Sequence, residues 1–312
     1  MSTGALGFRH EALFYSGENG FLAATLPFIR SAVGAEQPIM VAVSEARINA
    51  LRAVLNGEAE QVHFVDMGRL GRNPACIIPA WRDFAAEHAV DGRPLRGIGE
   101  PIWPGRSEAE LVECQQHEAL LNLAFAGVPA FWLVCPYDIG ALDPRVLEEA
   151  RRSHPFVAEP ETSAQSDSYI APDSRPGPFD GELPPPASEP SELAFGRDTL
   201  RTLRSFVSER AARAGLGRNR TADLVLAVSE VSTNSVLHGG GHGVLRMWQE
   251  GDTVLCEVRD AGRFDNPLVG RERPTGEQSS GRGLWLVNHL CDLVQLRSYP
   301  DENVVRLHMR RA

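Results

Sequence analysis

A proline- and acid-rich stretch at residues 155–192 most constrains how this chain can fold. It holds nine prolines and eight carboxylates against one arginine, Arg175. Such a segment buries too little apolar surface to offset the entropy lost on ordering, so we expect an extended or disordered linker. The stretch carries −7 of the net charge of −10, which leaves its flanks only mildly acidic. The sequence therefore predicts two domains, 1–157 and 193–312, joined by a linker over 158–192.

The region before the linker alternates short apolar runs with amphipathic stretches. Strands are expected at 12–15, 39–43, 62–65, 95–98 and 130–134, with helices near 18–33, 45–55, 75–89, 107–126 and 144–153. Strand–helix alternation of this kind is typical of an α/β fold whose parallel sheet is covered on both faces.

The region after the linker has a different order. Helices are expected near 194–214, 219–237 and 283–291, and strands at 243–249, 253–259, 293–298 and 303–309. Helices that precede strands joined by short turns predict a two-layer α/β sandwich, in which helices cover one face of a mixed sheet.

Three short patterns in this region indicate a nucleotide site. Glu230 and Asn234 are four residues apart and share a helix face, where the amide oxygen can ligate Mg²⁺ and the carboxylate can accept a proton. Asp260 ends a strand, where it can accept a hydrogen bond from an adenine amino group, and Gly262 lets the backbone approach the base. Each pattern also has an ordinary structural explanation, a solvated helix face or a tight turn.

The third pattern, Gly281-Arg282-Gly283-Leu284, opens an apolar helix. Backbone N–H groups at such a helix start are free to bind phosphate, and the helix dipole favours the anion. The order of the three patterns along the chain strengthens each of them.

In this order and spacing the patterns resemble those of the GHKL ATPase superfamily, within it the anti-sigma-factor serine-kinase branch. Glu230 and Asn234 are similar to its N box, Asp260 and Gly262 to its G1 box, and Gly281 and Gly283 to its G2 box. The resemblance implies a Bergerat-type fold that binds ATP and Mg²⁺, with Glu230 as catalytic base and Asn234 as metal ligand. Its partners would be a sigma factor and an anti-sigma-factor antagonist that is phosphorylated on serine or threonine.

Two departures from that family pattern touch nucleotide contacts. A second G1 glycine is absent, since the chain reads Asp260-Ala-Gly262-Arg-Phe264. The Gly-Thr that many relatives carry near the last strand is replaced by Glu302-Asn303-Val304. A non-catalytic module, in which ATP only gates binding of a partner, is therefore an alternative.

The first region resembles the MEDS sensory domain over residues 8–157, in its segments 10–15, 64–67, 97–104 and 135–138. The resemblance implies a RecA-like sheet and a sensing role, and the pairing with a GHKL domain is similar to that of RsbA-like anti-sigma regulators. Because ligands of parallel sheets bind at the carboxyl ends of strands, we expect a sensory rim, with a small-molecule signal as its ligand, formed by Tyr15, Asp66, Glu100, Trp103, Tyr137 and Asp138. Trp103 and Tyr137 could equally cap the core.

Several functions are disfavoured by the sequence. All 31 basic residues are arginine, so no Schiff-base lysine and no P-loop GK[ST] exist. The net charge of −10 argues against direct nucleic-acid binding. Five scattered cysteines without a CxxC pair indicate reduced thiols in a cytoplasm, and no apolar run is long enough to span a membrane.

A histidine kinase, an enzyme in the first region and a metal pair each have weaker support. A sensor histidine kinase needs a phosphoacceptor histidine in the helix before its ATPase domain, and residues 194–214 contain none. No nucleophile–base pair indicates an enzyme in the first region. Cys114 and His117, three apart on a helix, lack a visible third metal ligand, and His10 is expected to be structural. A homodimer remains open.

Overall fold

The computed structural model describes residues 7–88, 92–159, 162–274 and 281–311. The chain forms two compact units, Met1–Arg175 and Pro176–Ala312. No helix in the described residues is both long and apolar enough to cross a membrane. Both units are α/β, which confirms the predicted fold class.

The first unit is built on a seven-stranded sheet of order β3-β2-β4-β5-β1-β6-β7, parallel except for its last pair. The strands are β1 (Phe8–Tyr15), β2 (Ile39–Val43), β3 (Val62–Asp66), β4 (Leu95–Gly99), β5 (Phe131–Asp138), β6 (Phe156–Glu159) and β7 (Thr162–Gln165). Every residue of β2 is buried, as a strand covered on both faces requires.

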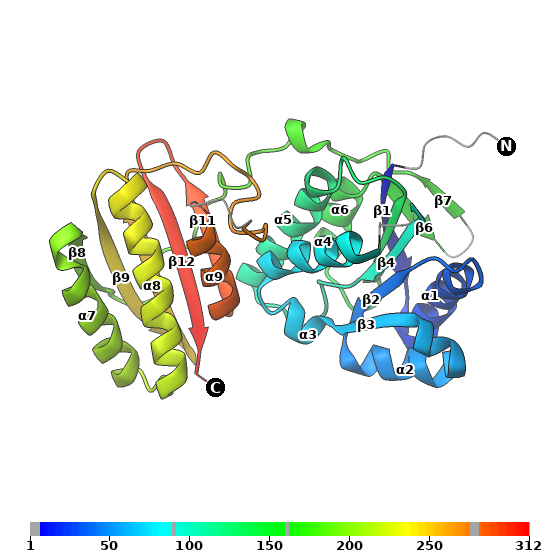
Figure 1. Cartoon of the computed structure of the whole chain (residues 1–312), viewed down its shortest axis with the longest axis horizontal. Helices are drawn as coiled ribbons and strands as arrows, with labels where there is room; N and C mark the ends of the chain where they lie inside the picture. Colours follow the sequence, from blue (N-terminus) through cyan, green and yellow to red (C-terminus); the bar gives the residue numbers. More distant parts are fainter. Residues whose placement is uncertain (1–6, 89–91, 160–161, 275–280, 312) are drawn as a thin grey trace. The chain divides into compact units, whose positions relative to one another are not determined.

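Helices lie on both faces of this sheet (Figure 1). They are α1 (Gly17–Gly34), α2 (Glu45–Leu55), α3 (Met67–Leu70), α4 (Ile77–His88), α5 (Glu108–Ala124) and α6 (Pro144–Ser153), with short 3₁₀ turns at Asn56–Gln61, Pro74–Cys76 and Pro172–Ser174. Side-chain caps fix several starts: Ser44 caps α2, Asp143 caps α6, and Ser107 with Glu110 forms a capping box on α5.

The second unit is built on a five-stranded sheet of order β11-β12-β10-β9-β8. Its strands are β8 (Ser191–Gly196), β9 (His242–Glu250), β10 (Thr253–Asp260), β11 (Leu293–Ser298) and β12 (Asn303–Arg310). All its pairings are antiparallel. The expectation of a mixed sheet was therefore wrong, because hairpins and the return from α9 bring each strand back beside its neighbour in the opposite direction.

Three helices, α7 (Leu200–Arg213), α8 (Arg218–His238) and α9 (Arg282–Leu290), cover one face of this sheet (Figure 1). Their apolar faces meet the inward residues of the strands in a common core, which includes Leu203, Val228, Val258, Val287 and Leu307. The predicted entry helix at 194–214 starts later than expected. Residues 191–196 pair with β9 as strand β8, because Leu193 and Phe195 alternate toward the helices and supply an edge strand.

The proline-rich stretch is more ordered than its composition predicts. Its first part forms β6 and β7, and β6 pairs in parallel with β1. Its later part packs on the second sheet: the Phe179 carbonyl accepts a hydrogen bond from the Ser298 N–H (3.0 Å), and the Phe179 ring lies 5.3 Å from that of Phe264. The expected linker is thus partly built into each unit, because backbone pairing and one buried aromatic ring compensate for its polar composition.

Candidate functional site

Glu230 and Asn234 lie on the same face of α8, as their spacing predicts, and both are half-buried. The first turn of α9 lies directly against them. A Cβ atom built on Gly283 would lie 3.0 Å from Glu230 Oε2 and 3.2 Å from Asn234 Nδ2. A side chain at position 283 would therefore force these two groups to shift by a few tenths of an ångström, so glycine favours this close approach.

Asp260, at the end of β10, is held by neutral donors. Its Oδ2 accepts a hydrogen bond from Ser235 Oγ (2.6 Å), and its Oδ1 accepts one from the Gly262 N–H (2.8 Å). Gly239, after α8, packs on the carboxylate, since a Cβ there would lie 2.6 Å from Oδ1. A carboxylate offers about four lone-pair directions, so Asp260 keeps acceptor capacity for a ligand. The sequence prediction missed Ser235, which follows Asn234 and is turned toward the sheet by the helical period.

The N-terminus of α9 has a backbone conformation and N–H groups that favour an anion. Gly281 is its N-cap and has a φ of 94°, a left-handed conformation that favours glycine. The first N–H groups of a helix have no partner within it and point along the axis, where the dipole is positive. A loop is expected from the sequence between the strand that ends at Asp260 and α9, and its residues 275–280 lie outside the described residues.

One cavity of about 410 Å³ brings all these groups together. Its volume is within the range of about 300–1,000 Å³ that small-molecule sites occupy. Every residue predicted for the nucleotide site lines it: Glu230, Asn234, Asp260, Gly262, Gly281, Arg282, Gly283 and Leu284. Groups from α8, the end of β10 and the start of α9 therefore converge as the motif order indicates.

The two segments that depart from the family pattern, after Asp260 and around Asn303, both make packing or hydrogen-bond contacts. Phe264 packs against the core and against Phe179. Asn303 stands opposite Asp260 in the sheet and lines the cavity. With its amide nitrogen toward Ser298 Oγ (2.6 Å), Asn303 accepts a hydrogen bond from the Arg263 N–H (2.9 Å). Asn303 therefore anchors the segment after β10, a role that only the strand register reveals.

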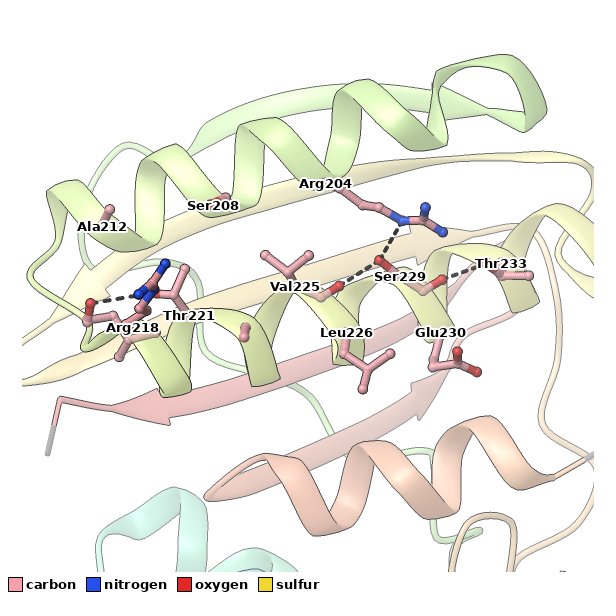
Figure 2. Close-up of a pocket in the computed structure, with 12 residues that line it drawn as sticks. Arg204, Ser208, Ala212, Arg218, Thr221, Val225, Leu226, Ser229, Glu230 and Thr233 are labelled. Atoms are coloured by element: carbon pink, nitrogen blue, oxygen red, sulfur yellow. Dashed lines mark hydrogen bonds between the residues drawn. The ribbon is translucent and has the colours of Figure 1, made fainter.

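A second cavity, of about 760 Å³, runs along α7 and α8 and ends at Glu230 (Figure 2). Arg204 and Arg218 line it, and Arg204 Nε donates to Ser229 Oγ (3.2 Å). Glu230 and Thr233 line both this groove and the 410 Å³ cavity. Glu230 therefore borders both cavities.

The predicted sensory rim is only partly assembled. Tyr15 and Glu100 meet, since the Tyr15 hydroxyl donates to Glu100 Oε1 (3.0 Å), and Arg47 forms an ion pair with the same carboxylate. Burial raises the pKa of Tyr15 to about 12, although Arg47 acts in the opposite direction. These three groups form a buried polar cluster where β1 and β4 end.

The other rim residues are engaged elsewhere. Asp66 and Asp138 accept backbone hydrogen bonds, from the N–H groups of Gly68 (2.9 Å) and Gly140 (3.0 Å) respectively. The guanidinium of Arg106 lies over the Trp103 ring, with its central carbon 3.6 Å from the ring centre. In the pairing of β5 with β1, Tyr137 lies beside Phe14, and Asp138 lies beside Tyr15. The Tyr137 side chain therefore projects from the face of the sheet opposite to that of Tyr15.

Tyr137 instead lies beside a group that the sequence did not predict: His10, Glu118, Cys135 and His154, all buried. The four come from distant parts of the chain, which hides them from motif reasoning. Cys114, considered with His117 as a metal pair, donates to the Pro101 carbonyl (3.4 Å), and burial raises its pKa to about 12.

Comparisons with known proteins agree with the two-unit organisation. Residues 9–155 match the family described as MEDS, the MEthanogen/methylotroph, DcmR Sensory domain, and residues 194–309 match the histidine kinase-like ATPase domain. Curated protein sequences gave no significant match.

Two solved structures show weak similarity. The RsbU and RsbW domains of Rv1364c from Mycobacterium tuberculosis share 20% identity at a TM-score of 0.30, over 66% of this chain and 49% of that one. The chain thus spans about half the length of that relative. Acinetobacter baumannii histidine kinase AdeS shares 9% identity at a TM-score of 0.25, over 39% of this chain and 68% of that one.

The family matches cover the same two regions as the compact units, and the second match contains every residue of the 410 Å³ cavity. The chain combines a MEDS sensory domain with a histidine kinase-like ATPase domain of the GHKL type.

Proposed function

We propose that this chain is a cytoplasmic signalling regulator whose second unit binds ATP with Mg²⁺ and phosphorylates a serine or threonine of a protein partner. The proposal rests on one observation. Glu230, Asn234 and Gly283 lie together in one cavity, which Asp260 also lines. By the motif resemblance, the partners are a sigma factor and its anti-sigma-factor antagonist, so the chain would act in a switch that controls transcription.

The cavity residues fit a nucleotide and a metal ion. Asp260 has lone pairs left for the adenine amino group, and the N–H groups at the start of α9 suit the phosphates. The Asn234 amide carries an oxygen of the kind that Mg²⁺ prefers. A bound Mg²⁺ would neutralise charge on the phosphate oxygens.

Glu230 is suited to accept the proton of an attacking hydroxyl. It stands beside Gly283 at the phosphate-binding end of the cavity, and the groove along α7 and α8 also reaches it. A serine or threonine of a partner that enters by the groove along α7 and α8 (Figure 2) would reach Glu230 at the end of this groove. This geometry favours phosphoryl transfer over a role in ATP binding alone.

The variant Glu230→Gln tests the proposal. A positioned acid–base group contributes about 10²–10⁴-fold to a rate, so transfer to the partner should fall by about that factor while ATP affinity changes only a few-fold. Partners are recovered from the source cell by pull-down with and without ATP, and their phosphosites are mapped. Glu209→Gln on α7, whose side chain is 67% exposed, is the matched control and should leave transfer unchanged. Equal transfer by Glu230→Gln and the wild type refutes the role of Glu230.

A second candidate is an ATP-gated latch without transfer. The observation that favours it is the altered G1 segment, in which Phe264 is partly buried against the core and Asn303 anchors the backbone. Wild-type protein that binds its partner in an ATP-dependent way, yet leaves it unphosphorylated, supports the latch. A phosphoryl group that is acid-labile would indicate instead a histidine kinase.

A further inference from the structure

Four side chains of metal-ligand type meet in the interior of the MEDS unit. They are His10 on β1, Glu118 on α5, Cys135 on β5 and His154 directly after α6, and their ligand atoms all lie within 4.8 Å of one another. Glu118 Oε2 lies 3.1 Å from His10 Nε2 and 3.3 Å from His154 Nε2. Cys135 Sγ lies 3.3 Å from His10 Nε2 and 3.4 Å from Glu118 Oε2. All four are buried, so no water competes freely for them.

Hydrogen bonds on the far side of each imidazole fix its tautomer. His10 Nδ1 lies 3.1 Å from Asn122 Oδ1, and Asn122 is oriented by donation of its Nδ2 to the Ser153 carbonyl (2.7 Å). His154 Nδ1 lies 2.8 Å from the Ala150 carbonyl. Because these oxygens only accept, both Nδ1 atoms carry a proton, so each imidazole, when neutral, presents its Nε2 lone pair to the centre. Metal-binding histidines are held in this way, with the other N–H donated to a carbonyl or carboxylate.

The cluster has more acceptors than donors. With both imidazoles neutral, two Nε2 lone pairs and a carboxylate face one another, and the Cys135 thiol is the one proton donor among the four side chains. Within the described part of the chain, Glu118 Oε1 and His154 Nε2 make no hydrogen bond. A buried carboxylate facing acceptors is costly unless a cation completes the site.

We propose that His10, Glu118, Cys135 and His154 form a tetrahedral site for a borderline-soft divalent metal ion of the Zn²⁺ type. Zinc bonds of about 2.0–2.3 Å place tetrahedral ligands about 3.3–3.8 Å apart, close to the 3.1–3.4 Å separations of the four measured pairs. Mixed nitrogen, oxygen and sulfur ligands suit Zn²⁺ rather than Mg²⁺ or Ca²⁺. On binding, the Cys135 thiol releases its proton to solvent, and carboxylate plus thiolate balance the +2 charge.

The proposed site has the closed form of a structural metal centre. All four positions are filled by protein ligands and none is left for a substrate. The ligands join β1, β5, α5 and the end of α6, so the ion would hold these elements together and enter as the unit folds.

The test uses the full chain, unfolded with a chelator and refolded with Zn²⁺ or Co²⁺. One ion per chain should survive dialysis, and the Co²⁺ form should show thiolate-to-metal charge-transfer absorption. Cys135→Ser should abolish that absorption. Cys114→Ser is the matched control, because Cys114 is also buried on this side of the sheet but bonds to the Pro101 carbonyl; it should keep the absorption.

A milder variant keeps the test decisive if Cys135→Ser fails to fold. Asn122→Ala removes the partner of His10, together with the bond from Asn122 Nδ2 to the Ser153 carbonyl, but none of the four ligands. It should weaken metal affinity about 10–100-fold, with unchanged far-UV circular dichroism. Wild-type protein should also release a proton and melt at a higher temperature when Zn²⁺ binds. The proposal is overturned if no ion survives dialysis, if bound Co²⁺ shows no thiolate absorption, or if Asn122→Ala binds Zn²⁺ as tightly as the wild type.

Discussion

Glu257 in the ATPase unit and Glu118 in the MEDS unit are buried alike, at 0% and 1% exposure, but their neighbours differ. Glu257 accepts hydrogen bonds from Arg306 (2.6 Å), Arg259 (2.8 Å) and Arg246 (3.4 Å). Glu118 faces two imidazoles and a thiol. Arginine carries a permanent charge, whereas these groups do not. Burial alone therefore does not show what a carboxylate does. Positively charged arginines around it indicate an ion pair, whereas neutral groups of metal-ligand type indicate a site for a cation.

The largest expected effect concerns Glu257. Glu257→Gln should lower the free energy of unfolding by about 3–5 kcal/mol, because loss of one partner leaves buried charge uncompensated. Burial raises the pKa of the Glu257 carboxyl, but hydrogen bonds from Arg259 and Arg306 outweigh this and lower it below its ordinary value. A lowered pKa contributes stability above the unfolded-state value of about 4.3, and this contribution is lost as the pH falls through the folded-state pKa.

Urea unfolding of both proteins at pH 7 and at successively lower pH measures this effect. The difference between wild type and Glu257→Gln should shrink once the pH is below about 4.3. Glu209→Gln, with an exposed side chain, should change stability by less than about 0.5 kcal/mol at any pH. A difference that does not depend on pH would show that shape, rather than charge, explains the role of Glu257.

Asp260 shows a third arrangement. Its carboxylate accepts hydrogen bonds from a hydroxyl and a backbone N–H, and among the described residues no arginine donates to it. Asp260→Asn should weaken ATP binding about 10–100-fold, since a lost charge-assisted hydrogen bond costs about 1.5–3 kcal/mol. Calorimetry with ATP and Mg²⁺ measures the change. Asp252→Asn, in the exposed turn between β9 and β10, is the control. Unchanged affinity in Asp260→Asn would remove the adenine contact from the site.

Of the three carboxylates, Glu118 should show the smallest effect of substitution when no metal is bound. In chelator-treated protein, Glu118→Gln should change the free energy of unfolding by less than about 1 kcal/mol, because the substitution removes a buried charge that has no permanent countercharge. Chemical unfolding measures this. A loss of several kcal/mol would show that a protonated imidazole balances Glu118, and that the cluster is an ion pair of the same kind as Glu257.

The sequence predicts the ATPase site better than the MEDS interior for a physical reason. Glu230 and Asn234 are one helical turn apart, and Gly281 opens a helix, so local geometry nearly determines their placement. The sequence pointed to Asn303 only as a departure from the family pattern, because its position beside Asp260 depends on the register of β12 with β10. Strand β8 was missed because its edge position depends on pairing with β9.

The MEDS cluster depends entirely on distant pairings. Cys135 reaches His10 only because β5 pairs with β1, and Glu118 only because α5 packs on that sheet. The predicted rim included Tyr137, but alternation along β5 sends its side chain to the face of the sheet opposite to that of Tyr15.

Another small effect is expected for Tyr15, whose hydroxyl donates to a carboxylate that already has Arg47 as a partner. Because Glu100 keeps that ion pair, Tyr15→Phe should cost only about 0.5–1.5 kcal/mol of unfolding free energy. Burial raises the pKa of Tyr15 to about 12, so the neutral phenol is favoured in the folded state. Its contribution is therefore present below the unfolded-state pKa of about 10 and lost as the pH rises toward 12. The ultraviolet difference titration of wild type against Tyr15→Phe should show no phenolate below about pH 11, one unit under the pKa given by burial. A difference that titrates near pH 10 would place the phenol in water, and Glu100 would then have only Arg47 as its partner.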